Sequence, residues 1–342
     1  MLSIIIPLYN REELIKNSLD SVLMQTNPHW ECLVVDDGST DNSCDVVEEY
    51  AKNDPRIILL RRTEDRPKGP SACRNIGCEH AKGEYVYYLD SDDILEPHFC
   101  ENISEQFEDN PGIDFIAVHV ALFRGSIHDL EWLPPAPVPD IPVLDYFLFH
   151  SFKASTQTFC WRKTLLDKFP RHWPEDMRRG VDRVCYYRIL TKQPKGMWWK
   201  KRIQLYLRIP KTTLFASPND RISNQKDSFY LSQHFVVATR VFEAYRTNGL
   251  LNNKSLTLYL NYCLNRERNI LLHRQFQAAK SFYREILSVS TEFHMSSKYG
   301  WMAYLYMKVW WLFPFHKLAQ RLFSVIKTSV CSFMKTSKTL KN

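Results

Sequence analysis

The sequence predicts an α/β fold in which a mostly parallel sheet is flanked by helices and followed by a helical C-terminal extension. Short runs rich in β-branched, aliphatic and aromatic residues recur at roughly even spacing, and helical patterns lie between them. These strand-like runs are Leu2–Pro7, Glu31–Val35, Arg56–Leu60 and Glu84–Leu89. Strands that alternate with helices predict right-handed βαβ units, and such units pair their strands in parallel.

Each intervening helix is predicted from its own pattern. The first follows Asn10–Glu13, which is similar to a capping box, and its apolar residues recur near a period of 3.6: Leu14, Ile15, Leu19, Val22 and Leu23. A second helix is expected after Gly38–Asp41. A third is expected from about Ser71 to Lys82, with Gly83 as the residue that ends it.

The composition is that of a globular protein. With 342 residues, 44% of them hydrophobic and 24% charged, the chain can bury one large core or two smaller ones. We expect two domains, residues 1–223 and 224–342. The nine cysteines are scattered and form no CxxC pair, which argues against a zinc site or a disulfide framework, and Cys32 and Cys185 are expected in the core. The opening run Met1–Ile6 is too short for a signal peptide, so we expect a cytoplasmic protein.

Three carboxylates follow the fourth predicted strand, at Asp90, Asp92 and Asp93. Crowded like charges repel unless a cation or a hydrogen-bonding partner is present. Magnesium takes oxygen ligands, commonly one or two carboxylates together with substrate phosphates. The segment therefore predicts a metal–diphosphate site, and the alternative is a plain turn, since Asp and Ser are common in turns.

Polar residues also stand at the ends of the other predicted strands. Because the carboxyl ends of parallel strands meet at one edge of a sheet, these residues are expected to lie close together. Tyr9 could stack on a base, Asp37 could accept a hydrogen bond from a base or a ribose, and Arg74 could face phosphate. The alternatives are a packed aromatic for Tyr9 and a plain turn for Asp37–Gly38.

The ordered motifs resemble those of the family 2 glycosyltransferases, which have the GT-A fold. The resemblance extends from the first residue to about residue 190, with weaker traces to about residue 223. The motifs that carry it are IIIPLYNREELIKNSLDSVLMQT, ECLVVDDGSTDNS, GPSACRNIGCEHAKGEYVYYLDSDD and FPRHWPEDMRRGVDRVCYYRIL. It implies transfer of a sugar from a nucleotide-sugar donor, often a UDP-sugar, to a glycan or lipid-linked acceptor, with inversion at the anomeric carbon.

The resemblance also implies roles for individual residues. The donor-binding residues are Pro7, Tyr9, Asp37, Arg74, Asp90 and Asp92, of which Tyr9 and Asp37 hold the nucleobase. Asp90 and Asp92 form the Asp-x-Asp pair, Asp92 is the expected ligand of Mg²⁺ or Mn²⁺, and Asp93 is expected to share that role.

An inverting transfer also needs a base to take the proton of the acceptor hydroxyl. In the family a Glu-Asp pair heads a helix, and the matching segment here is Gly180–Asp182, so Asp182 is the candidate catalytic base. The usual Glu is replaced by Val181. Glu175–Asp176 is a rival base, and Asp182 could instead cap its helix or pair with a neighbouring arginine.

The rest of the chain suggests how the enzyme meets its acceptor. Leu133–Val143 is rich in proline and predicts an irregular loop. After Glu292 the chain has no acidic residue but many lysines, and Tyr299–Phe315 is dense in aromatic residues. Aromatic and basic residues together suit a peripheral site at the inner face of a membrane. The alternatives are packing on the catalytic domain or a dimer contact; no nucleic-acid-binding motif is present.

Two other function classes predict sequence features that can be checked directly. A sugar-phosphate nucleotidyltransferase would need a Gly-rich, basic loop after the first strand, and Pro7–Asn10 is not such a loop. A non-catalytic sugar-nucleotide-binding scaffold at a membrane would be expected to have lost its Asp cluster or its base. Both are present, which favours the enzyme.

Overall fold

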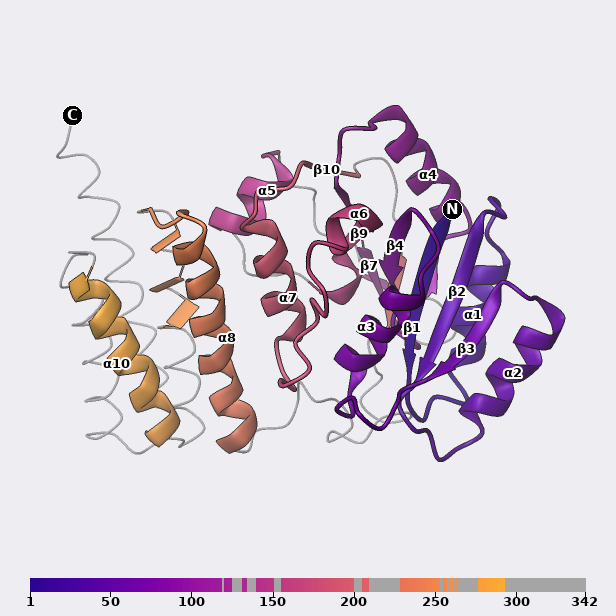
Figure 1. Ribbon diagram of the computed structural model, residues 1–342, viewed down its shortest axis with the longest axis horizontal. Helices are drawn as coiled ribbons and strands as arrows, with labels where there is room; N and C mark the ends of the chain where they lie inside the picture. The colour runs from indigo at the N-terminus through magenta and orange to yellow at the C-terminus, as the bar shows by residue number, and fades with distance from the viewer. Residues whose placement is uncertain are drawn as a thin grey trace. The chain divides into compact units, whose positions relative to one another are not determined.

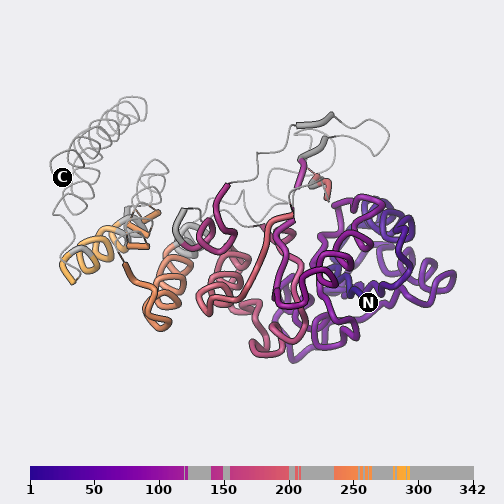
Figure 2. The backbone as a smooth tube through the Cα atoms, turned by 90° about the horizontal axis from the view of Figure 1, so that it is seen from above, coloured from indigo at the N-terminus to yellow at the C-terminus, as the bar shows by residue number. Residues whose placement is uncertain are grey.

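The computed structural model describes residues 1–118, 120–124, 131–133, 140–150, 155–199, 205–208, 228–252, 255–256, 259–260, 262–263 and 276–292. The chain divides into two compact units, Met1–Asn224 and Gln225–Asn342. Figure 1 labels most of the helices and strands, and Figure 2 traces the first unit from indigo to pink and the described part of the second from orange to yellow.

A seven-stranded sheet forms the centre of the first unit (Figure 1). Its strands are β1 (Leu2–Leu8), β2 (Trp30–Asp36), β3 (Ile57–Arg61), β4 (Tyr85–Tyr88), β6 (Phe115–Ala117), β9 (Phe159–Arg162) and β10 (Gly196–Trp198). Their order is β10-β6-β9-β4-β1-β2-β3. All neighbours pair in parallel except β9, which runs antiparallel to both β4 and β6.

A smaller sheet of four strands lies in the same unit, in the order β5-β11-β7-β8. These strands are β5 (Ile94–Leu95), β11 (Leu205–Arg208), β7 (Val120–Arg124) and β8 (Glu131–Leu133). The antiparallel pairing of β5 with β11 matters for the site, because β5 directly follows the carboxylates at 90–93.

The helices cover both faces of the large sheet. In the first unit they are α1 (Ile15–Leu23), α2 (Ser43–Asn53), α3 (Pro70–His80), α4 (Phe99–Asp109), α5 (Val143–Asp145), α6 (Lys163–Leu166) and α7 (Val181–Leu190), with a π turn at Tyr146–His150 and a 3-10 turn at Thr156–Thr158. The described helices of the second unit include α8 (Ser228–Thr247) and α10 (Phe276–Glu292).

Side-chain alternation along β1 assigns the helices to the two faces. Ile4 and Ile6 belong to one buried core with apolar residues of α1, α2 and α4. Ile5 points the other way, against Gly77 of α3. On that second face Tyr186 of α7 also packs against Trp161 of β9, with ring centroids 5.7 Å apart. The sheet is therefore the middle layer of three.

Most of the predicted fold is confirmed. Each of the four predicted strands matches its observed strand to within one residue at either end, and the large sheet is mostly parallel as expected. Cys32 and Cys185 are buried, and all cysteines in the described part of the chain are free.

The expected capping box at the first helix is wrong. α1 begins at Ile15, and its N-cap residue, Leu14, makes no side-chain capping bond. Asn10 adopts a left-handed conformation (φ 50°), and its side-chain oxygen accepts a hydrogen bond from the Thr40 backbone N–H at 2.8 Å. The Glu12 carboxylate likewise accepts from the Asn42 N–H at 3.0 Å. These polar residues tie the loops after β1 and β2 together instead of capping a helix.

The expected role of Gly83 is also wrong. α3 ends at His80, and Ala81 is already extended. A Cβ atom on Gly83 would lie 2.7 Å from both the Met1 carbonyl oxygen and the Ser3 backbone nitrogen. Glycine is therefore required here by the close approach of the chain to the start of β1, not by the end of a helix.

Some predictions fall outside the described residues. These are most of the proline-rich loop, at 134–139, together with the aromatic segment 299–315 and the basic tail. Within the ranges given above, no helix combines the length and the apolar character needed to cross a bilayer.

Candidate active site

A cavity of about 720 Å³ opens where β1, β2 and β4 end, at the carboxyl edge of the parallel strands. This volume is typical of small-molecule sites. Every site residue predicted from the sequence lines it: Pro7, Tyr9, Asp37, Arg74, Asp90, Asp92, Asp93 and Asp182. The structure thus brings together residues that are spread over more than half of the chain's length.

Tyr9 and Asp37 stand at one end of this cavity. The Tyr9 side chain is 41% exposed, so the alternative of a packed core aromatic is wrong. The Lys68 ammonium lies 3.9 Å from the centroid of its ring. The Asp37 carboxylate is buried and accepts hydrogen bonds from Arg62 Nε at 2.6 Å and from the Gly69 backbone N–H at 3.0 Å.

Asp36, not Asp37, builds the turn after β2. Its carboxylate accepts the backbone N–H groups of Gly38 at 3.0 Å and Ser39 at 3.1 Å. Gly38 has φ 84°, a left-handed conformation that favours glycine. The carboxylate of Asp37 is consequently free of this turn and faces the cavity.

Arg74 and Asp90 form an ion pair at the floor of the site. Arg74 Nη2 donates to Asp90 Oδ1 at 2.7 Å, and the guanidinium lies 4.6 Å from the centroid of the Trp173 ring. The Arg74 side chain is only 5% exposed, whereas that of Asp90 is 34% exposed. Arg74 Nε has no hydrogen-bond partner among the described residues, so this cation is not fully satisfied by the protein groups seen around it.

Asp92 and Asp93 differ sharply in their surroundings. Asp93 is 2% exposed, and its two carboxylate oxygens accept from the Arg208 backbone N–H at 2.9 Å and from Gln157 Nε2 at 2.7 Å. Asp92 is half-buried at the cavity wall. The engagement of Asp93 disfavours it as a metal ligand and leaves Asp92 as the candidate.

The carboxylates of the site decide whether it can hold a metal ion. In the described ranges, no group of three or more His, Cys, Asp or Glu side chains converges to hold a metal ion. A single carboxylate at Asp92 still fits Mg²⁺ or Mn²⁺, because such ions commonly take one or two protein carboxylates and complete their shell with phosphate oxygens and water. The residues present therefore suit a metal that arrives with a diphosphate.

Asp182 stands on the first turn of α7. The helix is preceded by Gly180 at φ 62°, so Gly180 and not Asp182 is the N-cap residue. The Asp182 carboxylate accepts the Arg183 backbone N–H at 2.8 Å. Burial raises the pKa of Asp182, and the nearby charge of Asp90 adds to this, although the arginine charges around it act in the opposite direction.

Glu175 is the rival base, and its surroundings differ. Its carboxylate accepts from Arg66 Nε at 3.0 Å and from Asn75 Nδ2 at 2.7 Å. Burial acts to raise the pKa of Glu175, but the hydrogen bonds from Arg66 and Asn75 outweigh it and hold the pKa below its usual value. Glu175 does not line the main cavity, and these contacts favour Asp182 as the base.

The sequence reasoning missed Arg208. This residue lies on β11, its Nε donates to the Asp92 carbonyl oxygen at 3.0 Å, and it lines the cavity. Burial lowers the pKa of Arg208, while the charges of Asp92 and Asp93 act to raise it. No local pattern could have found this contact, because it depends on the long-range pairing of β11 with β5.

Two further tryptophans, Trp198 and Trp199, stand at the end of β10 and directly after it. Trp199 is 4% exposed. The Trp198 indole N–H donates to the Ile141 carbonyl at 2.9 Å, and its ring packs 5.4 Å from that of Tyr146. Neither residue lines the cavity, so core packing is the better description.

The comparison with protein families decides the class of this domain. Residues 3–139 match the family model described as glycosyl transferase family 2. Residues 3–139 form a glycosyl transferase family 2 domain. The match contains the first three of the four motifs and confirms the resemblance that they predicted; the fourth motif, at residues 169–190, lies beyond it.

Curated relatives carry related names. A putative glycosyltransferase, EpsH, of Bacillus subtilis is 32% identical over 161 residues, which are 47% of this chain and 45% of that protein. The putative teichuronic acid biosynthesis glycosyltransferase TuaG of Bacillus subtilis is 43% identical over 93 residues, 27% of this chain and 36% of that protein. A poly(ribitol-phosphate) beta-glucosyltransferase of Bacillus spizizenii is 44% identical over 96 residues, 28% of this chain and 15% of that protein. The chain thus spans half or less of the length of these relatives.

Solved structures confirm the fold. TarS residues 1–349 of S. aureus in complex with UDP-GlcNAc matches with a TM-score of 0.51 and 19% identity, over 86% of this chain and 91% of that one. The mannosyltransferase PcManGT of Pyrobaculum calidifontis, in complex with GDP-Man and Mn²⁺, matches with a TM-score of 0.52 and 16% identity, over 98% of this chain and 86% of that one. Both likenesses support the GT-A fold expected from the motifs.

Proposed function

We propose that this protein is an inverting glycosyltransferase of cell-envelope glycan synthesis. It transfers a sugar from a nucleotide-sugar donor, a UDP-sugar, to a hydroxyl of a glycan or lipid-linked acceptor. The observation that carries the proposal is the single cavity in which Tyr9, Asp37, Asp92 and Asp182 meet. The names of TuaG and of the poly(ribitol-phosphate) glucosyltransferase support an envelope acceptor, and the UDP-GlcNAc complex of TarS supports the donor class.

The nucleotide binds at the end of the cavity that Tyr9 and Asp37 form. The exposed ring of Tyr9 offers a face on which a base can stack. The Asp37 carboxylate, held in place by Arg62 and the Gly69 N–H, accepts a hydrogen bond from the base. Pro7 lines the cavity beside them.

The diphosphate lies near Asp90 and Asp92. Asp92 would hold Mg²⁺ or Mn²⁺, and the metal, when bound, would neutralise the charge that develops on the departing diphosphate. The buried guanidinium of Arg74 and the side chain of Arg208 add positive charge at this end of the site. Asp90 orients Arg74 through their 2.7 Å ion pair.

Asp182 acts as the general base. As the acceptor oxygen forms its bond to the anomeric carbon, its proton passes to the Asp182 carboxylate, and the bond from that carbon to the diphosphate oxygen breaks. The electron pair leaves with the nucleoside diphosphate, and attack from the opposite face inverts the configuration. A pKa raised by burial makes Asp182 a stronger base than an ordinary aspartate, and such catalysis contributes on the order of 10²–10⁴ in rate.

Calorimetric binding and turnover across a panel of UDP-, GDP- and other nucleotide sugars test these roles. Wild type should bind one donor in a metal-dependent manner. The Asp92→Ala variant should lose this binding, whereas Asp182→Asn should bind the donor normally but fail to turn it over. A protein that bound no donor, with or without metal, would rule out the enzyme and favour a non-catalytic scaffold.

The proposed place of action is the inner face of the membrane. Support comes from the sequence alone, because the aromatic segment Tyr299–Phe315 and the basic tail after it combine the residue types found at anionic membrane surfaces. A lipid-linked acceptor would then be presented at the same surface as the enzyme.

A further inference from the structure

The loop that leads to Asp182 is fastened to α3 by a buried asparagine. Asn75 is 1% exposed and bonds the backbone of Trp173 twice: its Nδ2 donates to the Trp173 carbonyl at 2.8 Å, and its Oδ1 accepts the Trp173 N–H at 3.1 Å. A side-chain amide that satisfies both backbone groups of one residue fixes that residue in position and in orientation.

The same asparagine also holds Glu175, two residues further along the loop. Asn75 Nδ2 donates to Glu175 Oε1 at 2.7 Å, and Arg66 binds the Glu175 carboxylate from the other side. The Arg66 side chain is 4% exposed and is paired on its other edge with Glu79 of α3 at 3.1 Å. The Glu79 side chain is 45% exposed, whereas that of Glu175 is 12% exposed. The Arg66–Glu175 pair is therefore the one that solvent screens little.

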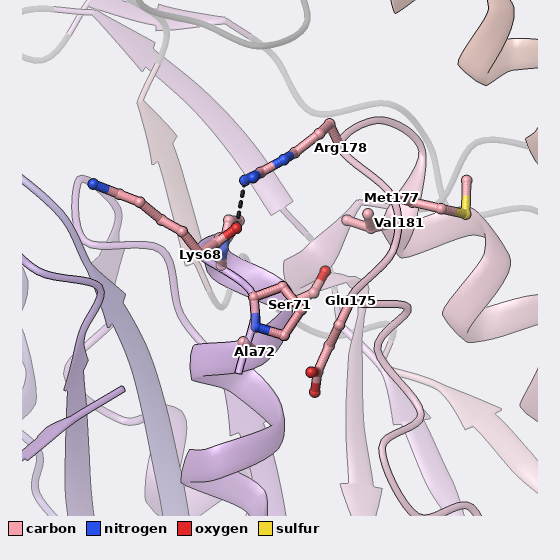
Figure 3. Close-up of a pocket in the computed structure, with 10 residues that line it drawn as sticks. Lys68, Ser71, Ala72, Glu175, Met177, Arg178 and Val181 are labelled. Carbon is pink, nitrogen blue, oxygen red and sulfur yellow. Dashed lines mark hydrogen bonds between the residues drawn. The ribbon is translucent and has the colours of Figure 1, made fainter. Parts of the chain in front are cut away.

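A further tether closes the loop near the cavity. In Figure 3 the Arg178 side chain extends from the loop before α7 and donates to the Lys68 backbone carbonyl, while Glu175 lies beside Ser71 and Ala72 at the start of α3. The segment from Trp173 to Arg178 is therefore attached to the segment from Arg66 to Asn75 at every second or third residue.

These contacts connect the Arg74–Asp90 pair at the donor end of the site with the segment that leads to the proposed base, Asp182, and both connections run through α3. α3 carries Arg74, which pairs with Asp90 at the donor end and stacks on the Trp173 ring. The neighbouring Asn75 holds the backbone of the same Trp173, and the chain then runs on to Asp182. Asn75 touches neither the cavity nor the groups that react.

We propose that Asn75 is a positioning residue that, through Trp173 and Glu175, sets the place of the base Asp182 relative to the Arg74–Asp90 pair. The proposal rests on the proposed function. A small displacement of a base from its acceptor lowers the rate without affecting groups that bind only the donor, and a shift of about 1 Å can cost on the order of 10²-fold. The loss of Asn75 should therefore appear in kcat and not in donor affinity.

The test compares Asn75→Ala with the matched control Asn102→Ala. Asn102 lies on α4, and its Nδ2 is buried without a hydrogen-bond partner among the described residues, so its removal breaks no such contact. Asn75→Ala should lower kcat by roughly 10- to 100-fold, with the dissociation constant of the donor unchanged, and should move the acidic limb of the pH–rate profile as the surroundings of Asp182 change. Asn102→Ala should match wild type in all three.

A paired substitution separates positioning from mere loss of folding. Asn75→Asp places a second carboxylate against Glu175 and should be as damaging as alanine. Adding Glu175→Gln to it returns a donor opposite an acceptor and should recover part of kcat. Lack of recovery, or a kcat loss in Asn75→Ala that merely follows the fraction of unfolded protein, would overturn the proposal.

Hydrogen exchange supplies a readout that does not depend on activity. Peptides covering residues 169–182 should exchange faster in Asn75→Ala than in wild type, with peptides of β1 and β2 unchanged as the internal reference. Unchanged exchange in 169–182 would overturn the anchoring. Wild-type protein that releases no nucleoside diphosphate from any donor would instead overturn the proposed function, and exchange alone would then decide whether Asn75 anchors the loop.

Discussion

The carboxylates of Asp92 and Asp93 are neighbours in sequence, and the structure predicts opposite consequences for their removal. Asp93 is buried and bonded through both oxygens, so its loss should destabilise the fold. Asp92 is half-buried at the cavity wall, so its loss should abolish metal-dependent donor binding and cost less stability than the loss of Asp93. The comparison of Asp93→Ala with Asp92→Ala therefore separates a structural from a metal-binding carboxylate.

The magnitude follows from the contacts of Asp93. Alanine at this position leaves two donors, the partly buried Arg208 N–H and the buried Gln157 Nε2, without their acceptor. Each such donor costs about 1–3 kcal/mol, so the free energy of unfolding should fall by about 2–6 kcal/mol. For a unit of this size about 2–4 °C is lost per kcal/mol, which gives a decrease in Tm of roughly 4–24 °C.

Asp93→Asn should be milder, because the amide keeps one oxygen acceptor for the Arg208 N–H and the Gln157 amide can turn to accept from it. We expect a loss of about 1–2 kcal/mol. Asp92→Ala should cost less than Asp93→Ala, because Asp92 is only half-buried.

Two measurements on the same protein preparations decide the matter: thermal unfolding, and calorimetric titration of the donor with and without Mg²⁺ or Mn²⁺. The reasoning would be refuted if Asp93→Ala unfolded at the wild-type temperature while losing metal-dependent donor binding. In that case Asp93 would be a metal ligand, as the sequence motif alone suggested.

The remaining predictions concern the base, the core and the membrane. Burial raises the pKa of Asp182 above 3.8. As the pH is lowered, the deprotonated fraction of Asp182, and with it kcat, should therefore fall at a higher pH than for an ordinary aspartate. A pH–rate profile measures this, and an acidic limb at or below pH 3.8 would contradict it. Gly77→Ala should destabilise the protein by about 1–3 kcal/mol, because its Cβ would lie 2.4 Å from the Ile5 side chain. Gly112→Ala, with nothing within 4 Å, is the control in the same unfolding assay and should be neutral. The full chain should float with anionic vesicles and not with neutral ones, and salt should weaken this binding; equal binding to both would contradict a basic membrane contact through residues 298–341.

Much of the fold could be predicted because its signals are local. Hydrophobic runs predicted the first four strands of the chain to within one residue, and the alternation with helices predicted their parallel pairing. The site residues on these strand ends could be grouped for the same reason, since parallel strands end at one edge. Asp182 could be predicted as the base only from the family motif, because its position depends on a helix far along the chain.

The features that were missed depend on contacts between distant segments. Arg208 reaches the cavity only because β11 pairs with β5, and the burial of Asp93 follows from that same pairing together with Gln157. The capping-box pattern at Asn10 failed because tertiary hydrogen bonds to the loop after β2 replaced a local cap. Glycine at position 83 is likewise required by the close approach of strand β1 and not by the end of helix α3.

The anomeric configuration of the sugar product tests the central claim most directly. Wild-type protein would be incubated with an α-linked UDP-sugar, a divalent metal and either an acceptor or water, and the first-formed product would be followed by proton NMR. The account predicts release of UDP together with a β-configured product, and loss of both in Asp182→Asn. An α-configured product, or no release of nucleoside diphosphate from any donor tested, would contradict it.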